Sequence, residues 1–159
     1  MLHVPHTSTP SQRLAELGLT LPSPPRPVAS YVPAVRSGNL LFVSGQIPIV
    51  AGKVIMTGAM PAAGSIEQAA AAARQCALNA LAVAAGELGT IDRIRRVVRV
   101  GCFVASEPDF GDQPKVANGA SDLLVAVFGE DGRHARAAVG SCALPLNVTV
   151  EVEFLFEVA

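Results

Sequence analysis

Aromatic side chains are scarce in this sequence, and tryptophan is missing altogether. The 159 residues include six phenylalanines and one tyrosine, although half of the chain is apolar. The hydrophobic core must therefore be built from Ala, Val, Leu and Ile. A chain of this length can bury such a core without a disulfide or a structural metal, so one domain is the default expectation.

An excess of charge of one sign is also missing. The chain has 12 Lys and Arg residues against 13 Asp and Glu residues, with a formal net charge of −1 at pH 7. This balance gives no electrostatic footprint for nucleic acid or anionic membranes. The main basic cluster comprises Arg93, Arg95, Arg96 and Arg99, and no aromatic residue lies between them to stack on bases. We therefore expect a solvated turn and strand start there, not an RNA site.

The cysteine pattern does not suggest disulfides or zinc. Cys76, Cys102 and Cys142 lie far apart, each in an apolar run, and no CxxC pair is present. We expect three reduced thiols in the core, acting as small hydrophobes and not as nucleophiles. His134 has no ligand-spaced companion, so we expect no metal site.

Targeting and membrane signals are absent too. The N-terminus has no basic segment followed by an apolar run, which favours a cytoplasmic location. The apolar stretch 66–88 is interrupted by Glu67, Arg74 and Glu87, so it is expected to be a soluble helix and not a membrane span.

The first 28 residues are predicted to precede the folded domain. Residues 1–9 have nothing that could form a core and are expected to be a mobile tail. Pro10 after Thr9 predicts a short helix to Leu17, outside the core. Four prolines in the run 21–27 predict an extended connector. The domain is then expected to cover 29–159.

Strand and helix signals follow one another through this domain. Ser37, Gly38 and Asn39 separate two apolar runs and predict a hairpin within 31–46. Ser65 and Gln68 have capping-box spacing, which starts an Ala-rich helix that ends before Gly89. The other predicted elements are short strand 54–56, strand 93–104, helix 115–128, and strands 134–143 and 148–158. This order predicts an α+β fold.

The last two strands differ in character. Strand 148–158 alternates apolar residues with Thr149, Glu151, Glu153 and Glu157, which predicts one core face and one acidic face. Strand 134–143 has small side chains around a lone Arg136. Such a strand leaves space beside it for a ligand or another chain.

Three segments together resemble the Rid (YjgF) family over 29–159. Tyr31 precedes a Ser-Gly-Gln-Ile-Pro turn at 44–48, Asn118 lies in the second predicted helix, and the C-terminal part has Ala135-Arg136, Leu144-Pro145 and Val150-Glu151-Val152-Glu153 in the family's order. The chain departs from the family at 134–138, where His-Ala-Arg-Ala-Ala replaces the usual Pro-Ala-Arg-Ser-Cys. It also has Ala29-Ser30-Tyr31 in place of Gly-Pro-Tyr.

The resemblance implies a chorismate-mutase-like fold, with a mixed six-stranded sheet, two helices packed on one face, and here an additional short N-terminal helix. The last strand is inserted into the middle of the sheet, and three subunits form ligand clefts where they meet. The best-known members hydrolyse 2-imino acids to 2-keto acids and ammonia without a metal or organic cofactor. Others are described as ribonucleases or translation inhibitors.

Arg136 and Glu151 are the candidate catalytic residues. A guanidinium binds a planar carboxylate through two parallel hydrogen bonds, so Arg136 is expected to hold the substrate. The alternative is an intersubunit salt bridge to a C-terminal acid. Glu151 is expected to activate the attacking water and return a proton to ammonia. The alternative is that Glu151 has no catalytic role and, with Glu153 and Glu157, forms a solvated strand face.

The remaining candidates are predicted to bind the substrate. The Tyr31 hydroxyl can donate to a carboxylate or water, while Ser44 and Gly45 offer a hydroxyl and backbone donors at a turn. Asn118 is the fourth candidate. Each of the four also has a purely structural alternative: edge packing for Tyr31, turn formation for Ser44 and Gly45, and backbone bridging for Asn118.

The sequence thus favours hydrolytic deamination of 2-imino or enamino acids at the interfaces of a homotrimer, with a small imino or keto acid as ligand. Neither nucleic acid nor a membrane is an expected partner. The alternatives are a non-catalytic trimer that binds small carboxylates and, less favoured, a ribonuclease.

Overall fold

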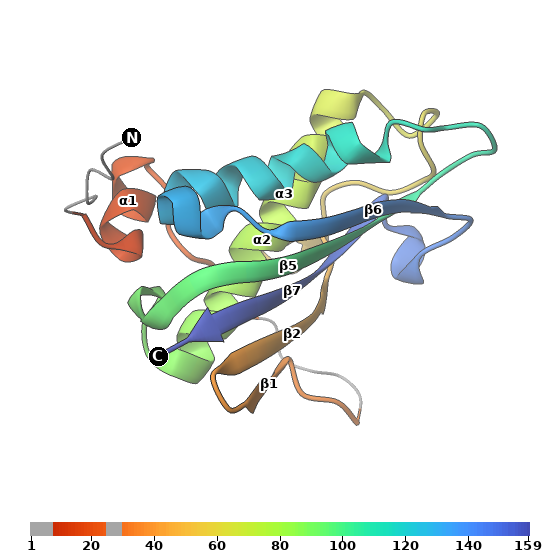
Figure 1. Cartoon of the computed structure of the whole chain (residues 1–159). Coiled ribbons are helices and arrows are strands. Elements are labelled where there is room, and N and C mark those ends of the chain that lie inside the picture. Colours follow the sequence, from red (N-terminus) through yellow and green to blue (C-terminus); the bar gives the residue numbers. More distant parts are fainter. Residues whose placement is uncertain (1–7, 25–29) are drawn as a thin grey trace.

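The computed structural model describes residues 8–24 and 30–159. Its elements in chain order are α1 (Pro10–Glu16), β1 (Ala34–Ser37), β2 (Leu40–Gln46), β3 (Ile49–Val50), β4 (Lys53–Val54), α2 (Ile66–Leu88), η1 (Ile91–Arg93), β5 (Ile94–Ala105), α3 (Gln113–Phe128), η2 (Gly129–Gly132), β6 (Ala135–Ser141), η3 (Pro145–Asn147) and β7 (Val150–Val158). These form a curved sheet with α2 and α3 packed on one face (Figure 1). The predicted α+β class is confirmed.

The main sheet has the strand order β1-β2-β7-β5-β6. Its central strand is β7, which runs antiparallel to both β2 and β5, whereas β6 runs parallel to β5. The last strand therefore lies between strands from earlier in the chain, as the resemblance implied. Its alternation is also confirmed, since Val150, Val152, Phe154 and Phe156 are buried under the helices.

The predicted sixth strand lies outside this sheet. The sheet formed by the described residues has five strands, and the segment around Val54 pairs only with Ile49 and Val50 in a two-stranded ribbon. Both edges of β2 are already paired, one with β1 and the other with β7, so no edge is left for a further strand beside β2. The chain that follows β2 instead forms its own hairpin. The turn residues Ala51 and Gly52 have φ values of 50° and 78°.

Helix α2 begins and ends where the sequence predicts. Ser65 and Gln68 form the complete capping box, and Gly89 ends the helix in the left-handed conformation with φ of 85°. Its small side chains let α3 approach its backbone closely. A Cβ added at Gly119 of α3 would overlap the carbonyl oxygen of Ala70. The backbone of α3, with its polar residues beside Gly119, is thereby held against α2.

Helix α1 is docked on the domain, so its predicted place outside the core is wrong. Leu14 is only 5% exposed and belongs to the hydrophobic core. Ser11 donates from its backbone nitrogen and its hydroxyl to the two carboxylate oxygens of Asp92, at 2.8 and 2.7 Å. Partial burial opposes ionisation of Asp92, but these hydrogen bonds outweigh it and lower its pKa. The predicted mobility concerns residues 1–7, which lie outside the described part, as do 25–29 of the connector and domain start.

The three cysteines divide into two classes. Cys76 and Cys102 are buried as predicted, and burial raises the pKa of the Cys102 thiol to about 12. Both are therefore poor nucleophiles at neutral pH. Cys142 is exposed, which contradicts the predicted core position. It follows the last residue of β6, where the chain has already left the sheet.

No described helix combines the length and the apolar composition that a membrane span requires.

Candidate functional site

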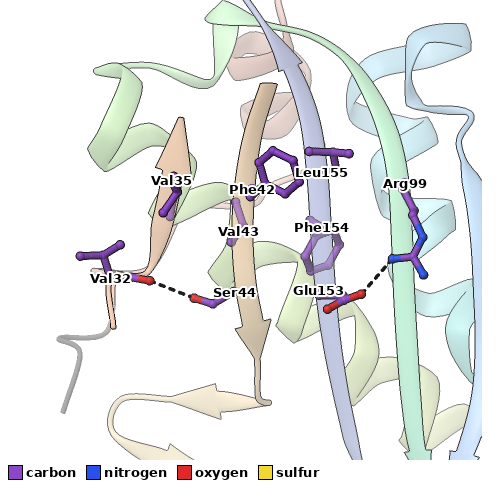
Figure 2. A pocket seen from close by; sticks show the side chains of 10 residues that line it. Val32, Val35, Phe42, Val43, Ser44, Arg99, Glu153, Phe154 and Leu155 are labelled. Carbon is purple, nitrogen blue, oxygen red and sulfur yellow. Dashed lines mark hydrogen bonds and ion pairs between the residues drawn. The ribbon is translucent and has the colours of Figure 1, made fainter. Parts of the chain in front are cut away.

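The sheet face opposite the helices is exposed and carries both apolar and charged side chains. Phe42 is 48% exposed and Val35 53%, and they lie together on the neighbouring strands β2 and β1 (Figure 2). Arg99 of β5 forms an ion pair of 2.8 Å with Glu153 of β7 beside them. A face of this kind is a poor solvent surface and suits contact with another chain.

A bulge in β2 places two predicted site residues next to β7. Val43 pairs with Phe154 and Gln46 pairs with Val152, so Ser44 and Gly45 together lie opposite one residue of β7. Bulges of this type re-aim side chains and are frequent beside functional sites. Here the bulge brings the Ser44–Gly45 backbone to the acidic side of β7.

Glu151 lies against this bulge. A Cβ added at Gly45 would overlap Oε1 of Glu151, so the carboxyl group occupies space that only a glycine leaves free. Burial raises the pKa of Glu151, and the like charge of Glu153 raises it further. Glu153 itself has Arg99 as a partner, and Glu157 accepts a hydrogen bond of 3.4 Å from Asn39. The three acids of β7 therefore differ in environment.

A cavity of about 690 Å³ opens beside the bulge. Tyr31, Ser44 and Gly45 line one part of it, and the structure thus brings together three of the predicted substrate-binding residues. Apolar side chains form much of the remaining wall. They belong to Pro22, Ile47, Ile49 and Leu146. The volume lies within the usual range for small-molecule sites.

Ser44 has a role that its sequence did not reveal. Its hydroxyl donates to the carbonyl of Pro33 at 2.8 Å, and its backbone nitrogen donates to the same oxygen at 3.0 Å. A longer contact of 3.4 Å reaches the carbonyl of Val32 (Figure 2). The hydroxyl proton is thus used inside the chain, and Ser44 holds the segment that carries Tyr31. Tyr31 precedes β1 instead of lying in it, because the strand begins only after Pro33.

Asn79 supports the far wall of the cavity and was not among the predicted residues. It is 4% exposed, and its amide donates to the carbonyls of Ile47 and Ile49 at 3.0 and 3.1 Å. Gln75 donates to its side-chain oxygen at 3.0 Å. An asparagine amid the Ala and Leu residues of a buried helix segment was a signal that could have identified this residue.

A second polar group lies at the β6 edge of the sheet, around Arg136. One nitrogen of its guanidinium, Nη1, donates to Oδ1 of Asn118 at 2.8 Å and to the Ser121 hydroxyl at 3.1 Å, and Nη2 donates to the carbonyl of Pro114 at 3.4 Å. All three acceptors are neutral. Among the described residues no carboxylate pairs with Arg136 and none accepts from its Nε. One edge of the guanidinium is therefore free for an anion.

Arg136 and Glu151 do not meet within one chain. Arg136 is in register with Val100, which is buried on the helix face, whereas Glu151 is in register with Phe103 on the exposed face. Paired residues of neighbouring strands point to the same side of a sheet, so the two candidates point to opposite sides. The structure forms two separated groups: Arg136 with Asn118, and Glu151 with the bulge at Gly45, which also lines the cavity beside Tyr31.

No group of three or more His, Cys, Asp and Glu side chains is arranged to hold a metal ion within 8–24 and 30–159.

Comparison with protein families gives a match over nearly the whole chain. Residues 11–158 match the family model described as "YjgF/chorismate_mutase-like, putative endoribonuclease". The matched range includes the Arg136 and Glu151 groups and all of helix α1 except its first residue.

Similar proteins come from distant organisms. The chain is 47% identical over 145 residues to Protein TCP17 of Trypanosoma cruzi, covering 91% of each protein. It is 28% identical over 135 residues to the 2-iminobutanoate/2-iminopropanoate deaminase of Dermatophagoides farinae, covering 85% of this chain and 91% of that protein. The crystal structure of the protein Atu1372 from Agrobacterium tumefaciens, whose function is given as unknown, is 46% identical. It superposes with a TM-score of 0.86 over 94% of this chain and 92% of that chain.

Proposed function

The chain belongs to the YjgF/chorismate mutase-like family, and from that premise we propose that it hydrolyses reactive 2-imino acids to 2-keto acids and ammonia in clefts between the subunits of a homotrimer. One observation carries the proposal: the guanidinium of Arg136, with one edge free, and the carboxyl group of Glu151, whose pKa is raised, lie on opposite faces of one sheet. The name of the Dermatophagoides farinae relative supports the choice of reaction.

The separation of the two groups supports an assembly that brings them together. In each copy the Arg136 group lies at the β6 edge, while the Glu151 group lies beside β2 and β7. A contact between two different patches of identical chains is heterologous, and it closes into a ring when the rotation allows. A three-membered ring would also cover the exposed apolar side chains of Val35, Phe42, Phe103 and Val139.

In the proposed cleft, Arg136 of one copy holds the substrate carboxylate through Nε and Nη2. Glu151 of the next copy takes a proton from water as the water oxygen bonds to the imine carbon. Glu151 delivers this proton to the imine nitrogen, which gives the neutral carbinolamine. It then takes the hydroxyl proton of the carbinolamine and passes it to the amino nitrogen as the C–N bond breaks, so the hydroxyl oxygen becomes the keto oxygen and ammonia leaves. Water and imino acid thus give keto acid and ammonia, with both water protons ending on the nitrogen. A carboxyl group with a raised pKa suits both halves of this transfer.

An imine-trapping assay tests the proposed reaction. 2-Iminobutanoate is generated from an amino acid with an amino-acid oxidase and trapped with semicarbazide. The protein should lower the yield of trapped imine, and light scattering should give the mass of a trimer. A trimer that binds 2-oxobutanoate but leaves trapping unchanged would instead identify a carboxylate-binding protein.

The ribonuclease alternative has weaker support in the structure. Two arginines of the basic cluster are engaged internally: Arg93 donates to carbonyls of Leu88 and Ala159, and Arg99 pairs with Glu153. Phosphate affinity requires several cationic contacts, so we expect no RNA binding that survives physiological salt. Salt-sensitive submicromolar binding lost in an Arg95/Arg96 double variant would contradict this expectation.

The substitution Arg136→Lys separates carboxylate binding from assembly. Lysine keeps the positive charge but replaces the planar fork with a point charge. Loss of one charge-assisted hydrogen bond is worth roughly 1.5 to 3 kcal/mol, so kcat/KM should fall about tenfold to a hundredfold. The melting temperature and trimer mass should stay nearly unchanged. Arg133→Lys is a matched control, because Arg133 is exposed and pairs only locally with Glu130. A loosened trimer with normal ligand affinity would show that Arg136 is a structural bridge.

A further inference from the structure

A chain of hydrogen bonds continues behind Arg136 into the domain. The Ser121 hydroxyl, which accepts from Nη1 of Arg136 at 3.1 Å, lies 2.9 Å from Nε2 of His134. The other ring nitrogen of His134, Nδ1, lies 2.6 Å from the carbonyl oxygen of Gly132. Ser121 is on α3, whereas His134 lies between η2 and β6. The hydrogen bonds thus connect the guanidinium of Arg136, on β6, to helix α3 and to the η2 turn.

The direction of each hydrogen bond in this chain is determined by chemistry. A carbonyl only accepts, so Nδ1 of His134 must carry a proton and donate it to Gly132. A guanidinium only donates, so the Ser121 oxygen must accept from Arg136. The single Ser121 proton then points to Nε2, which accepts it when His134 is neutral. From Arg136 through Ser121 and His134 to Gly132, the hydrogen bonds therefore have one consistent set of donors and acceptors.

We propose that His134 is a positioning residue for Arg136, acting through Ser121 to fix the orientation in which the guanidinium presents its free edge. The inference rests on the proposed function only for the identity of the ligand, a small carboxylate. Asn118 and Ser121 together fix Nη1, and the His134 ring prevents the Ser121 hydroxyl from rotating away. The free edge of the guanidinium is then pre-organised before the ligand arrives.

Protonation of His134 would disrupt this arrangement. With a proton on Nε2, two donors, one from the imidazolium and one from Arg136, would converge on the Ser121 oxygen. Burial lowers the pKa of His134, and the positive charge of Arg136 lowers it further against the opposing hydrogen bond to Gly132. The ring is therefore neutral at neutral pH. The other charged groups around it are Arg133 with its partner Glu130, and Arg96 and Glu157, which share a surface cavity with it.

Two substitutions at His134 test the proposal. His134→Phe keeps a flat ring but removes the acceptor, whereas His134→Gln keeps an acceptor and cannot titrate. NMR of the ligand-free protein measures the order of the Arg136 Nε–H bond and its exchange with water. Calorimetry with 2-oxobutanoate measures affinity between pH 5 and 8. Arg133→Ala is the control for altering the same loop.

The two substitutions should give opposite results. In His134→Phe, the Arg136 Nε–H should become more mobile, and affinity at pH 7.5 should fall roughly twofold to tenfold, as expected for loss of one supporting hydrogen bond. In His134→Gln, order and affinity should be retained, and the weakening of binding below the ordinary histidine pKa of about 6.5 should be reduced. Arg133→Ala should behave as the wild type.

The NMR measurement keeps this inference separate from the proposed function. If Arg136 stays equally ordered in His134→Phe, the positioning role is refuted, whatever the protein catalyses. If Arg136 becomes mobile in His134→Phe while the wild type neither binds 2-oxobutanoate nor removes imine, the positioning role stands and the proposed function fails.

Discussion

Replacing Glu151 with glutamine should lower kcat for imine hydrolysis by about two to four orders of magnitude, the usual contribution of general acid and base catalysis. The amide has nearly the shape of the carboxyl group and can still occupy the space beside Gly45, but it cannot take a proton from water. The binding of 2-oxobutanoate, which depends on Arg136, should change little. Single-turnover kinetics with imine generated in situ would measure the step directly.

The pH dependence of the wild type provides a second measurement of the same group. Because burial and Glu153 raise the pKa of Glu151, the active carboxylate should be lost on acidification at a higher pH than for an ordinary glutamate. The effect of this group on stability has the opposite pH dependence. Because its folded-state pKa is raised, the contribution of Glu151 to stability is most favourable below its unfolded-state pKa and is lost as the pH rises through the folded-state pKa. Glu151→Gln should therefore unfold no more easily than the wild type at neutral pH.

Glu153→Gln is the matched control for this prediction. Glu153 faces the same side of β7, but it is paired with Arg99, and both side chains are nearly half exposed. Its loss should cost at most about 1 kcal/mol of stability and leave the protein able to hydrolyse the imine. The acid limb of the pH profile should move to lower pH, because Glu153 no longer raises the pKa of Glu151. If Glu153→Gln abolished hydrolysis and Glu151→Gln did not, the catalytic assignment on β7 would be wrong.

Gly119→Ala should destabilise the protein by about 3 kcal/mol or more, a large share of the stability of an ordinary domain. In a solvated helix this change would stabilise by about 1 kcal/mol through helix propensity. Here the new methyl group would overlap the backbone carbonyl of Ala70, which has no rotamer to relieve the contact. The helices α2 and α3 must then separate, and Asn118 and Ser121 would shift with α3. Urea unfolding monitored by circular dichroism would measure the loss.

Gly111→Ala provides the comparison. Gly111 is exposed, and an added Cβ there meets no atom within 4 Å. Its substitution should change the free energy of unfolding by no more than about 0.5 kcal/mol. Equal stability of the two variants would mean that α2 and α3 are not in close backbone contact.

Local patterns in the sequence predicted most of the fold because they have local causes. The capping box at Ser65, the glycine at 89 and the alternation around Glu151 are each specified by neighbours in the chain. The strand order, by contrast, has no local cause. The central place of the last strand followed only from the family resemblance, since no local signal places this strand between β2 and β5.

The candidate site residues could be named from the sequence, but their contacts could not. Sequence chemistry singled out Arg136, whereas only the family resemblance distinguished Glu151 from the other acids of its strand. Strand alternation placed Glu151 on the face opposite the core. The positions of Arg136 and Glu151 on opposite sides of the sheet depend on the parallel register of β6 with β5, which is a long-range property. The hydrogen bond from Ser121 to His134 joins residues 13 apart across two elements, so no spacing rule could identify it. The docking of α1 depends on Asp92, 81 residues from Ser11.

The composition of the chain and the position of Tyr31 together have a spectroscopic consequence. Tyr31 is the one tyrosine of a protein without tryptophan, and it lies at the cavity beside the bulge with 54% of its surface exposed. Emission from the phenol ring therefore comes from a single known place and is not masked by indole fluorescence. A ligand that enters this cavity, or a neighbouring subunit that covers it, would change the intensity of that emission. The unlabelled protein thus has an intrinsic optical probe at its candidate site.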